Sequence, residues 1–170
     1  MYKHAFYNGR SPGAKFIHKG ILLVSDPHTH VETIFSDGMS WSSEFGLGPR
    51  FKNITYAHPE RWKFVEFPFI TPEQERVSRY RAELWVALQK AGHSSYDTLG
   101  AIGCRSSGRE NPWNLFCSEG CYDVFPDDLK ILALNVKMHP QKLLQIDELI
   151  KTISQKYINF SPSPPRVALR

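Results

Sequence analysis

The sequence predicts a single α+β domain in which a curved antiparallel sheet packs against a few helices. Two observations lead to this class. Short runs of alternating polar and apolar residues, separated by turn signals, fill residues 16–67, whereas capped segments with helical spacing dominate the rest. A chain of 170 residues is long enough for one domain with its own core. We expect this domain to cover residues 1–160, followed by a flexible tail at residues 161–170 with the sequence SPSPPRVALR.

The first part of the domain has the pattern of strands. The segment AKFIHKGILLVS predicts one or two short strands. The segments HVETIF and MSWSSEF flank the tight-turn signal SDG, which predicts a β-hairpin. The segments RFKNITY and RWKFVEFPF are further strand candidates. We therefore expect residues 16–67 to form one antiparallel sheet.

Helices follow. In TPEQERVSRYRAELWVALQKAG, Thr71 is placed to cap a helix, Pro72 suits its first position and Gly92 ends it. Its predicted apolar face consists of Val77, Tyr80, Leu84, Val86 and Leu88. Three later segments are also predicted to be helical: SSYDTLGAIG as a short helix, WNLFCSEGCYDVF as one that begins close to Cys117, and HPQKLLQIDELIKTISQKY as a long one.

Composition excludes several functional classes. Apolar residues make up 41% and charged residues 22% of the chain, as in ordinary soluble globular proteins. The net charge of +4 is scattered, so no basic run predicts a nucleic-acid partner. No run reaches membrane-spanning length, and the beginning, MYKHAFYNGRSPG, lacks the apolar core of a signal peptide. We therefore expect synthesis in the cytoplasm and no membrane span; the sequence leaves the oligomeric state open.

The stretch LLVSDPHTHVETIF contains two histidines, His28 and His30, which could be a pair of metal ligands. Two residues at this spacing on one face of a strand can share an ion. However, a catalytic zinc ion needs a third protein ligand, and the other histidines lie singly in the sequence. We expect no metal and no other cofactor, and keep a His-x-His metallohydrolase as a less favoured alternative. His28 is expected to be a turn residue whose ring no second polar group holds.

His30 has a better chemical context. It is expected to open a strand that carries Glu32 on the same face, while Cys117 is expected in the first turn of a helix. A helix N-terminus and a neighbouring imidazole both stabilise a thiolate, which is what a cysteine nucleophile requires. Burial in a core is nevertheless the commoner fate of a cysteine. We expect three free thiols, with Cys121 packed inside and Cys104 in a loop.

Four segments, HTHVETIFSDGMSWSSEFG, RWKFVEFPF, SYDTLGAIG and NPWNLFCSEGCYDVF, occur in an order that resembles a known family. They resemble the circularly permuted papain-like cysteine hydrolases, which are related to the NlpC-type cell-wall peptidases and to the YiiX-like proteins. In this group the histidine strand precedes the cysteine helix. The resemblance spans residues 20–125 and implies a permuted papain-like fold for the domain. Small relatives with similar sequence motifs are frequent among bacteriophage and bacterial proteins. The resemblance therefore also implies a phage-encoded protein that acts in the cytoplasm of its host as one origin of the chain.

Carried over to this chain, the resemblance implies that Cys117 is the nucleophile and His30 the general base. For the orienting third residue we prefer Glu32, because a carboxylate orients an imidazolium better than a hydroxyl group does. Alternatives for this role are Glu44 and Ser42. The backbone N–H of Cys117 is the expected oxyanion donor, since a helix start offers an unpaired donor. Three residues are expected to line the substrate groove: Tyr96, Asp97 and Trp113.

The expected function is that of a cysteine peptidase or amidase, or of a thiol acyltransferase, that works through a thioester. Its partner would be a peptide, amide or acyl substrate, such as a peptide of the cell wall. A catalytically inactive binding or assembly module with the same fold is the main alternative.

Overall fold

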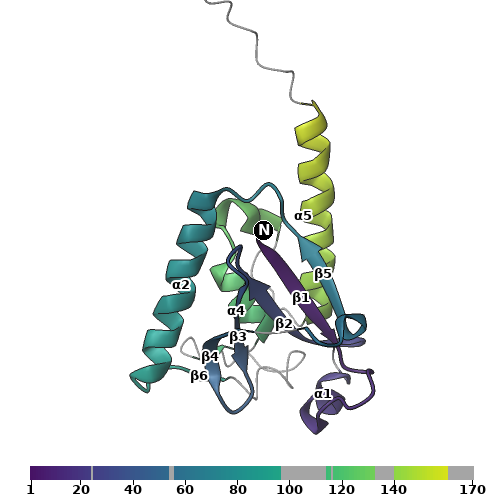
Figure 1. The fold of residues 1–170 in the computed structure, drawn as a ribbon, viewed down its shortest axis with the longest axis vertical. Helices are drawn as coiled ribbons and strands as arrows, with labels where there is room; N and C mark the ends of the chain where they lie inside the picture. Colours follow the sequence, from purple (N-terminus) through teal and green to yellow (C-terminus); the bar gives the residue numbers. More distant parts are fainter. Residues whose placement is uncertain (24, 54–55, 97–113, 116, 133–139, 161–170) are drawn as a thin grey trace, which may run out of the picture.

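The computed structural model describes residues 1–23, 25–53, 56–96, 114–115, 117–132 and 140–160 (Figure 1). Its class is α+β, as predicted, with a five-stranded antiparallel sheet. In the view of Figure 1, α4 lies behind this sheet, α2 lies to its left and α5 rises at its right. The strand order across this sheet is β4-β3-β2-β1-β5. Two residues each from β6 and β7 form a separate parallel pair.

The bounds of the elements are as follows. The strands of the main sheet are β1 (Lys3–Asn8), β2 (His28–Ile34), β3 (Met39–Glu44), β4 (Gly48–Asn53) and β5 (Trp62–Glu66), and the small pair is β6 (Ser95–Tyr96) and β7 (Asn114–Leu115). The helices are α1 (Phe16–Ile21), α2 (Pro72–Lys90), α4 (Cys117–Val124) and α5 (Pro140–Phe160), with short 3-10 turns at η1 (Pro59–Arg61) and η2 (Asp127–Leu132).

The predicted hairpin is confirmed. Strands β2 and β3 are joined by residues 35–38, where the Phe35 N–H donates to Met39 O at 2.9 Å. Gly38 has φ +87°, a left-handed conformation that glycine adopts without strain, so the SDG signal marks the turn. Hydrogen-bonded pairing of β2 with β3 is confined to Thr33 with Trp41 and Ile34 with Ser40. The ladder therefore covers only the end of β2 that is nearest the turn.

Three sequence predictions about elements were wrong. Residues 16–21 form helix α1 and not a strand: Ile21 is buried and the Leu22 N–H closes a helical turn on His18 O at 2.9 Å. Strand β1 lies before residue 16 and occupies a central place in the sheet, between β2 and β5. Residues 95–96 form a strand and not the start of a short helix; residues 97–103 of that predicted helix lie outside the described residues. The predicted tail at 161–170 also lies outside them.

Helix α2 begins as predicted. The Thr71 hydroxyl accepts from the Gln74 N–H, the Gln74 side chain accepts from the Thr71 N–H, and Pro72 occupies the first turn. The predicted apolar face was wrong in part: Val77, Tyr80 and Leu84 are exposed, Tyr80 by 67%, whereas Val86 is partly buried against the core. The residues that α2 buries are the small Ser78 and Ala82, which let the helix approach the core closely.

The core lies between the sheet and the helices behind it. Its members come from all parts of the chain and include Tyr2, Phe6, Val31, Phe35, Trp41, Phe67, Cys121, Val124, Phe125, Leu143, Leu144 and Ile150. Strand β2 is packed against both α4 and α5, so its side chains meet residues from the end of the described chain. Within the described residues, none of the helices combines the length and apolar character needed to cross a membrane.

Candidate active site

A bulge near the start of β2 separates His28 from His30. His28 pairs with Asn8 and His30 pairs with Tyr7, so Thr29 is an extra residue opposite one step of β1. Because neighbouring residues of a strand point to opposite faces, the partners of the two histidines place them on opposite faces of the sheet. The bulge fits tightly, since a Cβ added to Gly9 would lie 2.4 Å from the Thr29 side chain.

The surroundings of the two rings agree with this separation. The His28 ring lies beside Phe6, and its Nδ1 is 2.7 Å from Oε1 of Gln141 in the first turn of α5. The expectation of an unheld turn residue at position 28 was therefore wrong. The His30 ring lies beside Trp62 and His18 instead. The metal-site hypothesis required both histidines to lie on one face of the strand. Because the bulge places them on opposite faces, this requirement is not met.

His30 is held between Glu32 and Cys117. Its Nε2 donates to Glu32 Oε1 at 3.1 Å, and its ring is also hydrogen-bonded to the Cys117 side chain. The ring is mostly enclosed, with 13% of its side chain exposed. The structure thus brings together three residues that were singled out from the sequence.

The charges of this group reinforce one another. Burial acts to lower the pKa of His30, but the hydrogen bonds to Cys117 and Glu32 outweigh it and raise this pKa to about 9. Burial likewise acts to raise the pKa of Glu32, yet the bonds from His30 and Lys52 lower it to about 2. At neutral pH the pair is therefore an imidazolium bound to a carboxylate.

Glu32 is fixed from several sides. It is 1% exposed, and its Oε2 accepts from the Ser40 hydroxyl at 2.7 Å and from the Tyr56 hydroxyl at 3.1 Å. Its Oε1 also forms an ion pair with Lys52 Nζ. A buried carboxylate with this many donors has a fixed orientation, which is what an orienting residue requires.

Cys117 is the first residue of α4, as the sequence predicted. The thiol is 2% exposed and unoxidised. One turn further along, Cys121 is fully buried, and its thiol donates to the carbonyl oxygen of Val31 at 3.7 Å. Burial, the largest influence, raises the pKa of Cys121 well above the usual value. The two thiols therefore differ in their surroundings: only Cys117 adjoins an imidazole.

The alternatives for the third residue occupy other places. Glu44 binds Arg50, and its Oε2 lies 3.4 Å from Lys52 Nζ. The Ser42 hydroxyl donates to the Val31 carbonyl oxygen at 2.8 Å, where the hydrogen-bonded ladder between β2 and β3 has ended. Among the three candidates named from the sequence, Glu32 is the one for which a bond to His30 is seen.

The expected groove residues are described only in part. Tyr96 belongs to β6, which pairs with β7 just before α4, but nothing of its side chain is described. Asp97, Trp113 and Cys104 lie outside the described residues.

A pocket of about 300 Å³ opens beside His30 and Glu32. Its walls come from the segment 13–21, from β1, β2, β4 and β5, and from the turn after β3; the other lining residues are Tyr7, Gly13, Lys15, Ile17, His18, Ile21, Thr29, Glu44, Phe45, Lys52 and Trp62. The His30 ring thus has Cys117 as one neighbour and an open pocket as another.

Sequence reasoning missed several residues of this group. Lys52 and Tyr56 both reach Glu32, and His18 lies beside His30 with its Nδ1 2.9 Å from the Thr29 hydroxyl. The register of the β3–β4 hairpin could have indicated Lys52, because this residue pairs with Ser40, which bonds Glu32. For His18 the sequence carries no such signal, since it depends on how α1 folds back against β2.

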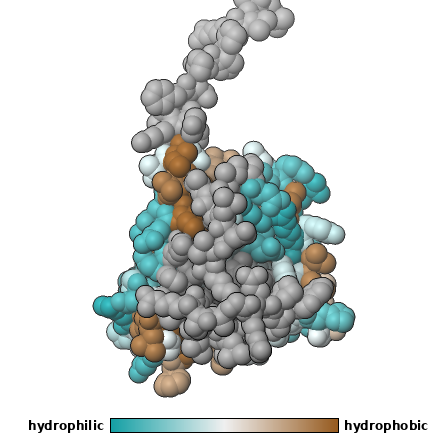
Figure 2. Space-filling model, turned by 180° about the vertical axis from the view of Figure 1, so that it is seen from behind, coloured by the Kyte–Doolittle hydropathy of each residue, from teal (hydrophilic) through white to brown (hydrophobic). Residues whose placement is uncertain are grey.

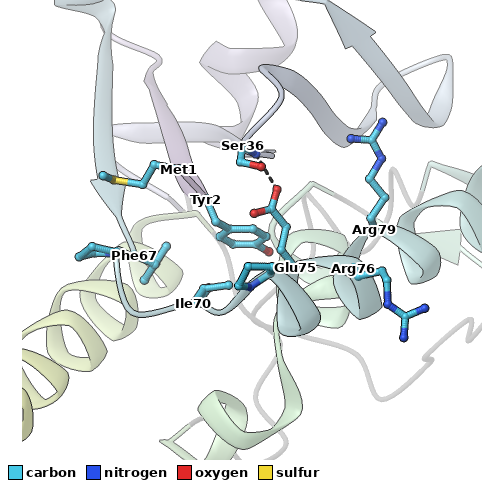
Figure 3. Close-up of a pocket in the computed structure, with 10 residues that line it drawn as sticks. Met1, Tyr2, Ser36, Phe67, Ile70, Glu75, Arg76 and Arg79 are labelled. Atoms are coloured by element: carbon cyan, nitrogen blue, oxygen red, sulfur yellow. Dashed lines mark hydrogen bonds between the residues drawn. The ribbon is translucent and has the colours of Figure 1, made fainter.

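A second pocket, of about 540 Å³, lies near the turn between β2 and β3 (Figure 3). Tyr2 and Glu75 lie at its centre, and Glu75 Oε1 accepts from the Ser36 N–H at 2.6 Å. The arginines at its rim are engaged elsewhere: Arg76 binds Glu73, and Arg79 binds Asp37. The described residues that line it include no histidine or cysteine, so we place the candidate active site at His30.

Comparison with models of protein families, with curated proteins and with solved structures found no match for this chain.

Proposed function

We propose that this protein is a thiol hydrolase in which Cys117 is the nucleophile, His30 the acid–base and Glu32 the residue that orients His30. The observation that carries this proposal is the position of the His30 ring, which is hydrogen-bonded both to Glu32 and to the Cys117 side chain. A nucleophile, a base and an orienting group in this mutual arrangement are the minimum set for covalent acyl transfer.

The first half-reaction would cleave the substrate. The thiol proton resides on His30, which leaves a thiolate on Cys117. The thiolate attacks the carbonyl carbon of an amide or ester, so that a C–S bond forms and the carbonyl oxygen becomes an oxyanion. The backbone N–H of Cys117, at the start of α4, is the proposed donor to this oxyanion. Collapse of the intermediate breaks the C–N or C–O bond, and His30 gives its proton to the departing amine or alcohol.

The second half-reaction would release the product. A water molecule gives a proton to His30 as its oxygen attacks the thioester carbon. The C–S bond then breaks and the acid product leaves; the proton taken from water stays on His30, which restores the starting pair of a thiolate and an imidazolium. An alcohol or amine in place of water would make the same site an acyltransferase. Each step uses groups that the chain itself supplies.

The order of the two parts of the site supports a permuted papain-like fold as part of this proposal. The histidine lies on β2, in the first half of the chain, and the cysteine begins α4, after all five strands of the main sheet. This is the order that the resemblance implies, and the sheet is antiparallel, as that fold requires. We propose an amide, peptide or acyl ester as the substrate, with a cell-wall peptide as one candidate.

The direct test is the reactivity of Cys117. At about pH 6, where ordinary thiols react slowly, iodoacetamide should alkylate Cys117 at least about ten-fold faster than free cysteine. Peptide mapping by mass spectrometry would identify the modified thiol. Cys121→Ala should react as the wild type does, and Cys117→Ala should lose the fast reaction and any hydrolysis of thioester or amide model substrates. Slow alkylation of Cys117 would contradict the proposal, and fast alkylation without turnover of any substrate would favour an inactive binding module.

A further inference from the structure

The pocket beside His30 contains a cation whose charge is not neutralised. Of the charged residues that line it, Glu32 and Glu44 are both paired with Lys52, and Glu44 is also paired with Arg50. Lys15 also lines the pocket, and within the described residues no ion pair is formed by its ammonium group.

Lys15 lies close enough to act inside the pocket. It precedes α1, and Ile17, His18 and Ile21 of that helix form the adjoining wall. The positive charge of Lys15 is felt at His18, where burial first, then His30 and Lys15, lower the pKa to about 4. At neutral pH His18 is therefore uncharged, and it adds a hydrogen-bonding ring to the pocket without adding charge.

The remaining walls are aromatic and aliphatic. Tyr7 and Trp62 lie together on neighbouring strands, with ring centroids 5.1 Å apart, and the turn after β3 contributes Phe45, which is 48% exposed. Beyond the pocket, the apolar surface continues on α1 and just after it, where Phe16 and Leu23 are 88% and 84% exposed. Figure 2 shows a hydrophobic patch at its lower left, on the side of the molecule where α1 lies. As far as the described residues show, the pocket thus combines an apolar body with the positive charge of Lys15, for which no ion pair is seen.

We infer that this pocket binds the part of the substrate next to the reacting carbonyl, that this part has an apolar body and a carboxylate, and that Lys15 binds the carboxylate. The inference rests on the proposed function, because it takes His30 as the catalytic end of the pocket. Lys15 is then a specificity-determining residue: it favours anionic substrates over neutral substrates of the same shape and takes no part in bond cleavage. A phosphate could satisfy the same cation, and the experiment separates the two anions.

The first experiment compares two alkylating agents of nearly equal size, iodoacetate and iodoacetamide, at Cys117. Only iodoacetate carries a carboxylate. Lys15→Gln should slow the reaction with iodoacetate about three-fold at low ionic strength, and leave the reaction with iodoacetamide unchanged. Lys19→Gln is the matched control: Lys19 is an exposed cation of α1, four residues further along the chain, and it is not among the residues that line the pocket. An unchanged ratio of the two rates in Lys15→Gln, or an equal loss with Lys19→Gln, would overturn the inference.

The second experiment does not depend on a reactive thiol. The indole N–H resonance of Trp62 should shift when 3-phenylpropanoate is added, and the shift should be weak with 3-phenylpropanamide and weak in Lys15→Gln. If the pocket binds inorganic phosphate as tightly as 3-phenylpropanoate, Lys15 is a phosphate-binding residue, and the inference that it binds a substrate carboxylate is wrong. If Cys117 proves inert but 3-phenylpropanoate binds through Lys15, the proposed hydrolysis is wrong and the anion pocket stands. If Cys117 is reactive but Lys15→Gln changes neither the alkylation by iodoacetate nor the binding of 3-phenylpropanoate, the proposed hydrolysis stands and the anion pocket is wrong.

Discussion

His28 and His30 lie on opposite faces of β2, although a single residue separates them, because Thr29 forms a bulge against β1. His28 is bonded to Gln141 of α5, whereas His30 is bonded to Glu32 and Cys117. Sequence spacing makes the two histidines look like a pair; the bulge gives them different roles.

Replacement of each histidine should therefore have a different effect. His30→Ala removes the acid–base, and we expect hydrolysis to fall on the order of 100-fold or more and the fast alkylation of Cys117 to be lost. His28→Ala should leave both nearly unchanged and cost about 1 kcal/mol of stability, since it loses the bond to Gln141. Rates of alkylation and urea unfolding of both variants check this. Equal loss of activity in the two variants would return the metal-site hypothesis to consideration.

The bonds of His30 should also make stability depend on pH. The pKa of His30 is raised to about 9 in the folded protein and is about 6.5 in an unfolded chain, so the folded state binds this proton more tightly. The resulting stabilisation is complete below about pH 6.5 and is lost as the pH rises through about 9. The free energy of unfolding of the wild type, relative to His30→Gln, should fall across this window in urea titrations. Parallel curves for the two proteins would show that His30 titrates normally.

Lys52 should protect the fold against acid through Glu32. Bonds from His30 and Lys52 lower the pKa of Glu32 to about 2 against the effect of burial, so its stabilisation is present above about pH 4.3 and is lost as the pH falls towards 2. Lys52→Met removes one of these partners, raises the pKa of Glu32 and should move the acid-unfolding midpoint to higher pH. Lys52→Arg should restore it. Lys63→Met is the control, because the Lys63–Glu148 pair is exposed, and it should move the midpoint little.

A second buried pair joins β1 to α5. His4 Nδ1 lies 2.7 Å from Asp147 Oδ2, and the two side chains are 0% and 1% exposed. Burial, opposed by His4, raises the pKa of Asp147. His4→Leu or Asp147→Leu should each cost about 3–5 kcal/mol, because either change leaves one buried polar group without its partner. The double variant should cost less than the sum of the two, and guanidinium unfolding measures all three. Additive losses would show that the two residues do not interact.

The parts of the fold that were predicted correctly have local causes. The Ser-Asp-Gly turn fixes the β2–β3 hairpin through the positive φ of Gly38, and Thr71 with Gln74 fixes the start of α2. Such signals act within a few residues and can be found in one sequence. The helix at 16–21 was missed because its apolar spacing is equally compatible with a short strand, and what decides between them is the burial of Ile21 against the rest of the protein.

In the candidate site, too, the residues with local sequence signals could be predicted, and the contacts that depend on strand register could not. Cys117 and His30 could be named because a helix start and an alternating strand are local patterns, and Glu32 because it lies two residues from His30 on the same strand. The separation of His28 from His30 could not be predicted, since it depends on the register between β1 and β2. Lys52 is an intermediate case: its bond to Glu32 depends on the pairing of β4 with β3, so the register of that hairpin has to be predicted before Lys52 can be named.

The two halves of the proposed catalytic pair belong to elements made early and late in the chain, β2 and α4. During synthesis or refolding, Cys117 is therefore an ordinary thiol until α4 has docked against β2 and β3. The alkylation rate of Cys117 therefore reports how far tertiary folding has progressed. A pulse of iodoacetamide during refolding would label at the activated rate only those molecules in which α4 has already docked against β2 and β3.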